Sequence, residues 1–164
     1  MTDTYDFDAV DAALISAVQE HARLSIAELG QRIHLGPSAT RARLTRLESA
    51  GIITGYHADV APKKAGFALR AVVRMKVHGS RFDQVQTVLD DEPQVIRCLR
   101  ITGEACYTIE FLAHDMTDLE RFTSRLARIG SITTDLVYEV VVDRRTPIPQ
   151  SEPSDAPKAS YLPH

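Results

Sequence analysis

The sequence is poor in the residues that build metal centres, disulfide frameworks and membrane spans. Its 164 residues include only two cysteines, Cys98 and Cys106, which do not form a CxxC pair. The six histidines are scattered and no two are four residues apart, so the spacing typical of a structural metal site is missing. No apolar run approaches the roughly 20 residues of a membrane helix, and no signal-peptide pattern opens the chain. We therefore expect a cytoplasmic protein with free thiols, no metal, no other cofactor and no membrane partner.

The charges of the chain are segregated along its length. The net charge is −3, which by itself argues against nucleic acid as a partner. Residues 1–20, however, contain five acidic side chains and no lysine or arginine, whereas residues 21–57 contain five arginines against two glutamates. Residues 58–145 are balanced. A positive stretch in an otherwise acidic chain indicates a DNA-binding segment, because its field steers the phosphate backbone toward it.

The same positive stretch lies within a set of signals for three short helices joined by tight turns. Apolar residues recur at helical spacing within each segment, as Val10, Leu14 and Val18 do in the first, so that each helix has one buried side. The signals for helix ends are Asp8 as N-cap and Asp11 as a first-turn charge, a capping box at Ser25 and Glu28, Gly36 and Pro37 at the start of the third helix, and Gly51 at its end near Ala50.

The third helix projects arginine and small polar side chains away from its apolar side. Such a face suits the major groove, because arginine binds guanine edges or phosphate, and serine and threonine bind either. Arg43 lies nearer the core edge, where an ion pair with Glu28 or Glu48 and a DNA contact are both compatible with its position. A solvated face of a three-helix bundle is the alternative. The predicted DNA-binding residues are Ser38, Arg41, Ala42 and Thr45, with Arg46 on the flank.

From Leu69 onward the apolar period changes to two, as in a half-buried strand. The predicted elements are a strand over 69–78, a helix over 81–90, strands over 95–102 and 105–113, a helix opened by Thr117-x-x-Glu120 and ended by Gly130, and a strand over 132–143. The order βαββαβ predicts a ferredoxin-like sheet with two helices on one face. On the second strand, Val95, Arg97, Leu99 and Ile101 share one face, and Ile96, Cys98, Arg100 and Thr102 share the other. The face without helices would expose Val, Ile and Cys, so we expect a second copy to cover it.

These elements predict an α+β chain with four parts. Residues 52–60 are expected to form a short extended segment after the third helix, and the final segment holds five of the eight prolines. The parts are an N-terminal winged helix-turn-helix domain over 1–56, a linker over 57–67, a βαββαβ domain over 68–145 and a disordered tail over 146–164.

Several motifs make the chain resemble the leucine-responsive regulator / asparagine-operon activator (Lrp/AsnC) family. The resemblance covers roughly residues 6–145 and is carried by Phe7-Asp8-x-x-Asp11, Arg23-x-Ser25-x-x-Glu28-Leu29-Gly30, Leu35-Gly36-Pro37-Ser38, Arg43-Leu44-x-Arg46-Leu47-Glu48-x-x-Gly51-Ile52-Ile53, Val95-x-x-Cys98 and Ile101-Thr102-Gly103. It implies a transcriptional regulator rather than an enzyme, with double-stranded DNA as partner. It also implies homodimers formed through the C-terminal sheets, which in the family often assemble into octamers.

The resemblance further implies a small effector, usually an amino acid, bound by the ACT-like C-terminal domain at contacts between dimers. The chain departs from the family pattern at two places. Gly36 replaces the serine at the N-cap of the third helix, and in the effector loop Cys106 stands where the family commonly has aspartate after "T-G", with Ala105 replacing the aromatic before it. Gly103 offers close backbone approach to a ligand, although Thr-Gly is also common in plain β-turns. The predicted effector-binding residues are Thr102, Gly103, Glu104 and Cys106, with Tyr138 and Glu139 on the last strand.

Three classes of function follow from these patterns. The leading hypothesis is an effector-responsive transcriptional regulator. The altered loop at Glu104–Cys106 keeps an architectural DNA-binding protein without a ligand switch as the alternative. A ferredoxin-like enzyme lacks support, because the sequence has no paired carboxylates, no phosphate-binding glycine loop and no Cys/His arrangement.

Overall fold

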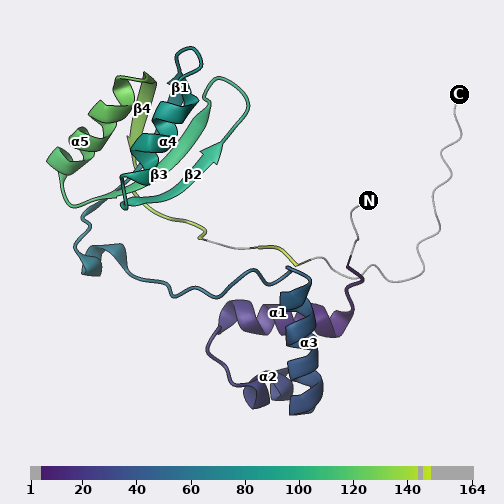
Figure 1. The fold of residues 1–164 in the computed structure, drawn as a ribbon. Coiled ribbons are helices and arrows are strands. Elements are labelled where there is room, and N and C mark those ends of the chain that lie inside the picture. Colours follow the sequence, from purple (N-terminus) through teal and green to yellow (C-terminus); the bar gives the residue numbers. More distant parts are fainter. Residues whose placement is uncertain (1–4, 144–145, 149–164) are drawn as a thin grey trace, which may run out of the picture. The chain divides into compact units, whose positions relative to one another are not determined.

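The computed structural model describes residues 5–143 and 146–148. The chain divides into two compact units (Figure 1): residues up to Ala58 together with 146–148 form the first, and residues 59–143 form the second. Most of the predicted disordered tail, residues 149–164, lies outside the described residues. None of the helices in the described part of the chain is both long and apolar enough to cross a bilayer.

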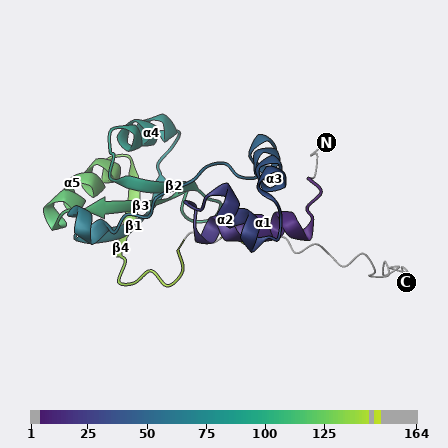
Figure 2. The ribbon, with the colours of Figure 1, turned by 90° about the horizontal axis from the view of Figure 1, so that it is seen from below.

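The N-terminal unit consists of three helices around a small apolar core. Its elements are α1 (Ala9–Glu20), α2 (Ile26–Arg32) and α3 (Pro37–Ser49). Helix α3 crosses α1 steeply, as Figures 1 and 2 show. Leu14 and Leu47 are completely buried, and Ile148 returns to pack against the same cluster. The predicted helices are confirmed, because each has one apolar side facing the other two.

Local signals set the ends of these helices. The Asp8 carboxylate accepts the Asp11 N–H at 2.7 Å, and Ser25 and Glu28 form the expected capping box. The turn before α3 packs against Gly30 of α2, where a Cβ would lie 2.5 Å from the Leu35 carbonyl oxygen, so only glycine allows this approach. Gly36 is the N-cap of α3 and provides no side-chain hydrogen bond. Residues within a few positions of the turn between α2 and α3 therefore determine where α3 begins.

The structure does not contain the predicted wing. No strand occurs among the described residues of the N-terminal unit, and 52–60 do not pair as an extended segment. The N–H groups of Ile52 and Ile53 both donate to the Leu47 carbonyl, at 3.0 and 3.2 Å, which curls the chain back onto the end of α3. The Tyr56 hydroxyl donates to Glu48 at 2.7 Å. Residues 52 and 53 therefore continue the end of α3, and the described residues 54–60 follow without forming a paired strand.

The C-terminal unit is a four-stranded antiparallel sheet with two helices on one face. Its elements are β1 (Leu69–Val77), α4 (Phe82–Asp90), β2 (Val95–Arg100), β3 (Tyr107–Ala113), α5 (Met116–Ala127) and β4 (Gly130–Leu136), after a 3₁₀ turn η1 (Pro62–Ala65). The strand order is β2-β3-β1-β4, so the predicted ferredoxin-like βαββαβ fold is confirmed. Phe111 of β3 and Phe122 of α5 stack at 4.1 Å in its core.

A β-bulge changes the faces of β2 from those that strict alternation predicts. Val95 pairs with Phe111 and Cys98 pairs with Ile109, with a register shift between Val95 and Arg97. One extra residue in the bulge breaks the alternation, so Val95 and Cys98 both pack on the helix-covered core. The prediction that they lie on opposite faces was wrong, and Cys98 does not contribute to the open face.

Three other boundaries in this unit differ from the sequence prediction. The N-cap of α5 is Asp115, which accepts the Asp118 N–H at 2.8 Å, and not Thr117. Gly130 does not end a helix but begins β4, where it is buried against β1. Strand β4 ends at Leu136, which pairs with Ala71, and only one further backbone hydrogen bond follows, from the Val137 N–H to the Arg70 carbonyl at 2.8 Å.

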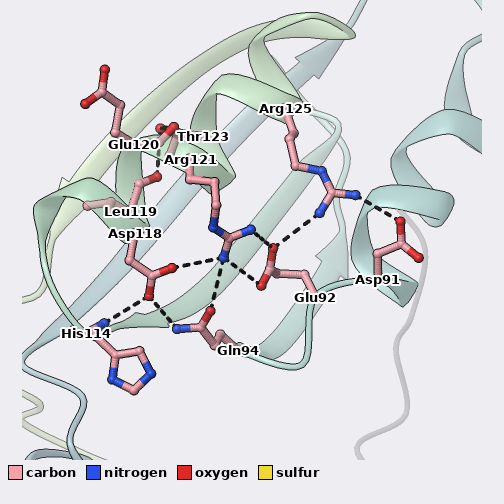
Figure 3. A network of polar contacts seen from close by, with 10 residues as sticks. All are labelled: Asp91, Glu92, Gln94, His114, Asp118, Leu119, Glu120, Arg121, Thr123 and Arg125. Carbon is pink, nitrogen blue, oxygen red and sulfur yellow. Dashed lines mark hydrogen bonds and ion pairs between the residues drawn. The ribbon is translucent and has the colours of Figure 1, made fainter.

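A polar network joins the loop between α4 and β2 to α5 (Figure 3). Arg121 donates to both carboxylate oxygens of the buried Glu92, at 2.8 and 3.1 Å, and Arg125 donates to Glu92 at 3.3 Å. Arg121 also donates to Asp118 at 2.9 Å, and Asp118 accepts from the backbone N–H of His114 at 3.1 Å. These contacts fix the end of the sheet where η1 enters the unit, because His114 stacks on Phe67 there.

Candidate DNA interface and effector site

The outward face of α3 is built as the helical period predicts. Thr40 and Leu47 point inward and are completely buried, and the Thr40 hydroxyl donates to the Gly36 carbonyl at 3.0 Å. The residues opposite them are exposed and line a shallow surface hollow: Pro37, Ser38, Arg41, Ala42 and Thr45. Four of the five predicted DNA-binding residues therefore lie together on one accessible face.

Arg46, the fifth, is held by α1. Its Nη2 donates to both oxygens of Asp11, at 3.0 and 3.3 Å, and its guanidinium lies 5.3 Å from the centre of the Tyr5 ring. The Asp11 side chain has no exposed surface, whereas 54% of the Arg46 side chain is exposed. Arg46 therefore lies on the flank, as predicted, but with a partner that the sequence analysis did not identify.

Arg43 also pairs with α1. Its Nη1 lies 2.7 Å from Asp11 and 2.6 Å from Asp8. The hydrogen bonds that Arg43 donates to Asp11 and then to Asp8 raise the pKa of Arg43. The hydrogen bond from the Asp11 backbone N–H, together with Arg43, lowers the pKa of Asp8. The two pairings considered from the sequence, with Glu28 and Glu48, do not occur: Glu28 bonds Ser25, and Glu48 accepts from Tyr56.

Folding neutralises most of the positive stretch. Arg32 pairs with Glu20 at 3.2 Å, so three of its five arginines are bound by acidic residues of α1 and its cap. Residues 5–58 together contain six acidic side chains and five arginines. Among the described residues, only Arg23 and Arg41 of this stretch have no salt-bridge partner. On the outward face of α3, Arg41 is therefore the arginine whose positive charge no acidic side chain of the described residues neutralises.

The loop between β2 and β3 contains most of the predicted effector-binding residues. Thr102, Gly103 and Glu104 are exposed, and Gly103 has a positive φ of 113°, which glycine adopts without strain. The Cys106 N–H donates to the Met75 carbonyl at 2.7 Å, and its side chain packs against the hydrophobic core. The loop thus offers a carboxylate and backbone groups to solvent, while its thiol is turned toward the core.

Tyr138 and Glu139 do not lie on a strand, contrary to the sequence prediction, because β4 ends before them. They also follow the end of β4 that lies far from the loop between β2 and β3, which contains the other predicted effector-binding residues. Tyr107, next to the loop, pairs with Met75, which pairs in turn with Ile132 near the start of β4. Tyr138 comes after the opposite end and is fully exposed. Within one chain the six predicted effector-binding residues therefore fall into two separate groups.

The face of the sheet without helices is more charged than the sequence analysis expected. Arg70 pairs with Glu110, and Arg74 pairs with Asp135 at 2.9 Å. Cys98 faces the helices, where burial raises the pKa of its thiol, so a reactive thiolate is disfavoured. Leu99 is 41% exposed and contributes apolar surface beside these ion pairs.

Comparison with known proteins identifies both units. A model of the AsnC-type helix-turn-helix domain matches residues 7–48, and a model of the Lrp/AsnC ligand-binding domain matches residues 70–147. These two ranges coincide with the three-helix unit and with the βαββαβ sheet.

Individual relatives extend over nearly the whole chain. The HTH-type transcriptional regulator LrpC of Bacillus subtilis is 28% identical over 134 residues, which cover 82% of this chain and 93% of LrpC. Its solved structure superposes with a TM-score of 0.81 at 27% identity, covering 85% of this chain and all of that one. The HTH-type regulator y4tD of Sinorhizobium fredii is 32% identical over 142 residues, 85% of this chain and 84% of y4tD. The regulator NMB0573 of Neisseria meningitidis, solved as a complex with L-Met, gives a TM-score of 0.79 at 27% identity over 88% of this chain and 97% of that one.

Proposed function

Since the chain belongs to the Lrp/AsnC family of helix-turn-helix transcriptional regulators and contains that family's ligand-binding domain, we propose that it binds specific DNA sequences through α3 and that an amino acid modulates this binding. The observation that carries the proposal is the exposed face of α3, which combines one arginine with two hydroxyl side chains. As a regulator that must reach DNA, it acts in the cytoplasm.

The DNA contacts are assigned to the outward face of α3 and its flank. Arg41 can donate two parallel hydrogen bonds to a guanine edge, and Ser38 and Thr45 can bond bases or phosphates. Ala42 is small and lets the helix axis approach the groove. Arg46 lies beside them on the α1 side.

The effector is assigned to the loop at Thr102–Cys106. The exposed carboxylate of Glu104 can hold an α-ammonium group, and the backbone at Gly103 can approach an α-carboxylate closely. L-Met bound to NMB0573 supports an amino acid as ligand. Because Tyr138 and Glu139 lie at the opposite end of β4 in one chain, their participation requires a second copy.

That second copy is part of the proposal. The chain forms homodimers through the open face of the sheet, where Val72 and Leu99 lie among the ion pairs, and the dimers assemble further into octamers. Sedimentation of the purified chain tests this: a monomer at micromolar concentration contradicts it.

Selection from a random pool of duplex DNA by the full chain tests the DNA-binding function. We expect a consensus sequence that Arg41→Ala binds at least tenfold more weakly at fixed salt. Enrichment of no sequence would contradict specific binding.

A thermal-shift screen of the twenty amino acids tests the effector. At millimolar concentration the ligand should raise the melting temperature, because it binds the folded state alone, and Glu104→Gln should abolish the shift. If no amino acid stabilises the chain, yet the chain still selects DNA, the alternative applies: an architectural DNA-binding protein without a ligand switch.

A further inference from the structure

The side chain of Asp11 links α1 to α3, the helix whose outward face is the proposed DNA-binding surface. It lies in the first turn of α1, has no exposed surface, and binds Arg43 at 2.7 Å and Arg46 at 3.0 Å, both from α3. A buried carboxylate is tolerated only where its partners hold a fixed geometry. The position of Asp11 therefore restricts the rotation of α3 about its own axis relative to α1.

That rotation decides which arginine faces DNA. At 100° per residue, Arg41 and Arg46 are separated by about 140° around the helix. Arg41 lies near the middle of the exposed face with Ser38, Ala42 and Thr45. Because only the central face of a helix in the major groove reaches base edges, Arg46 stands too far around the helix to share the role of Arg41.

The environment of Arg46 leads to the same conclusion. Its charge is shared with Asp11, and the Tyr5 ring lies against its guanidinium. The four charges of Asp8, Asp11, Arg43 and Arg46 cancel within the cluster. A side chain fixed in this way can orient a helix, but it has no freedom to follow the sequence of the bound DNA.

We propose that Asp11 is a positioning residue for the recognition helix, acting through Arg46 and Arg43, and that Arg41 alone among the arginines of α3 determines sequence specificity. This inference rests on the proposed function, because it assigns roles within the same DNA interface. It divides three arginines that look equivalent in the sequence into one specificity-determining side chain and two that hold the helix.

The test uses the full chain and the DNA duplex that the wild type selects from a random pool, with every single-base variant of that duplex. Affinities are measured for Arg41→Ala, Arg46→Ala, Arg46→Lys, Asp11→Asn and the double variant Asp11→Asn/Arg46→Ala. Arg32→Ala is the matched control, because it breaks an arginine–glutamate pair that does not involve α3. All measurements are made at a temperature where circular dichroism shows each variant fully folded.

For the wild type, we expect the affinity to fall by tenfold or more when one particular base pair, or its symmetric copy, is changed. Arg41→Ala should lose this difference between the duplexes. Arg46→Ala and Asp11→Asn should weaken binding to all duplexes by one common factor of about tenfold, leaving the ranking of bases unchanged. Arg46→Lys should recover part of this factor. The double variant should bind as Asp11→Asn does, because Asp11→Asn already disrupts the contact with Arg46.

Three results would overturn the inference. Arg46→Ala could abolish discrimination at a base pair, which would make it a reader. Asp11→Asn could leave the affinity of the folded chain unchanged, which would make its role purely one of stability. The two changes could also add in full in the double variant. Failure of the wild type to select any sequence would instead contradict the proposed function itself.

Discussion

Asp11 on α1 accepts a 2.7 Å hydrogen bond from Arg43 on α3, although the two residues are 32 positions apart and the Asp11 side chain is completely buried. The sequence suggested a different role for Asp11, as a charge that favours the first turn of its own helix. Asp11 does lie in the first turn of α1, but its side chain also links α1 to α3 through Arg43 and Arg46.

Replacing Asp11 with alanine should therefore destabilise the N-terminal unit strongly. Removal of the buried carboxylate leaves Arg46 without its acceptor and leaves Arg43 with Asp8 alone. Because both guanidiniums are partly exposed, the cost is about 1–3 kcal/mol in the free energy of unfolding. Urea denaturation followed by circular dichroism measures this. Glu20→Ala on the same helix is the control: its pair with Arg32 is on the surface, so its loss should cost less than about 1 kcal/mol. Equal effects would contradict the account.

Gly36→Ser should stabilise the same unit. Gly36 is the N-cap of α3 without a side-chain acceptor, its φ is −67°, and a Cβ there would meet no atom within 4 Å. A serine hydroxyl can accept a free N–H of the first turn, which is worth a few tenths of a kcal/mol over glycine. The midpoint of urea denaturation should rise with an unchanged slope. A lower midpoint would show that the serine cannot reach the first turn.

Gly130→Ala should have the opposite effect on the C-terminal unit. Its Cβ would lie 2.2 Å from the Lys76 carbonyl oxygen, a backbone atom that cannot move away without breaking the β1–β4 pairing. Overpacking of this kind costs roughly 1–3 kcal/mol. Gly55→Ala is the matched control, since its Cβ would meet only the tip of His57 at 3.9 Å. Calorimetry should show a lower melting temperature for Gly130→Ala alone.

Asp118 should contribute to the loss of stability in acid. Burial acts to raise the pKa of its carboxyl group, but hydrogen bonds from Gln94, the His114 backbone and Arg121 outweigh burial, so the pKa lies below the ordinary 3.8. The native state then binds this proton less readily than the unfolded chain does. The stabilisation is therefore present above 3.8 and is lost as the pH falls below it.

Melting temperatures of the wild type and Asp118→Asn between about pH 5 and 2.5 measure this contribution. The gap between the two proteins should close as the pH falls. Asp83→Asn is the control, because the Asp83 carboxylate has no hydrogen bond or salt bridge among the described residues and lies exposed in the first turn of α4. A gap that stays constant over this range would show that Asp118 does not act through its charge.

His114 should protect the turn that leads into the C-terminal unit. Its ring stacks on Phe67 at 4.5 Å, and its Nδ1 lies 2.9 Å from the Gly66 carbonyl, so Nδ1 must carry the hydrogen. Trypsin cleaves after lysine, and η1 contains Lys63 and Lys64. Because cleavage requires local unfolding, His114→Ala should accelerate cleavage there by roughly threefold or more, whereas His114→Phe, which keeps the stacking, should do so less. Cleavage after Arg23 should keep its rate, and a parallel increase there would contradict a local role for His114.

Much of the fold follows from patterns within a few residues. The helix ends at Asp8, Ser25 and Gly36 depend on side chains or backbone groups three or four positions away, and the structure has each of them where the sequence predicts. The errors arise where a distant segment decides. The bulge at Val95–Arg97 depends on the neighbouring strand β3, which no local pattern contains.

The same division holds for the candidate sites. The sequence by itself determined the three helices, the exposed face of α3 and the βαββαβ order, because helical and strand periods and capping motifs are local properties of the chain. The resemblance to the Lrp/AsnC family came from short motifs, which are also local. Only the tertiary structure decided the charge of that face: folding places Asp8, Asp11 and Glu20 against arginines that are distant in sequence, and a summed charge along the chain does not record which charges meet. It also placed Tyr138 and Glu139 at the opposite end of the sheet from Thr102–Cys106, because strand direction and register, and not residue type, determine which ends of the strands lie together.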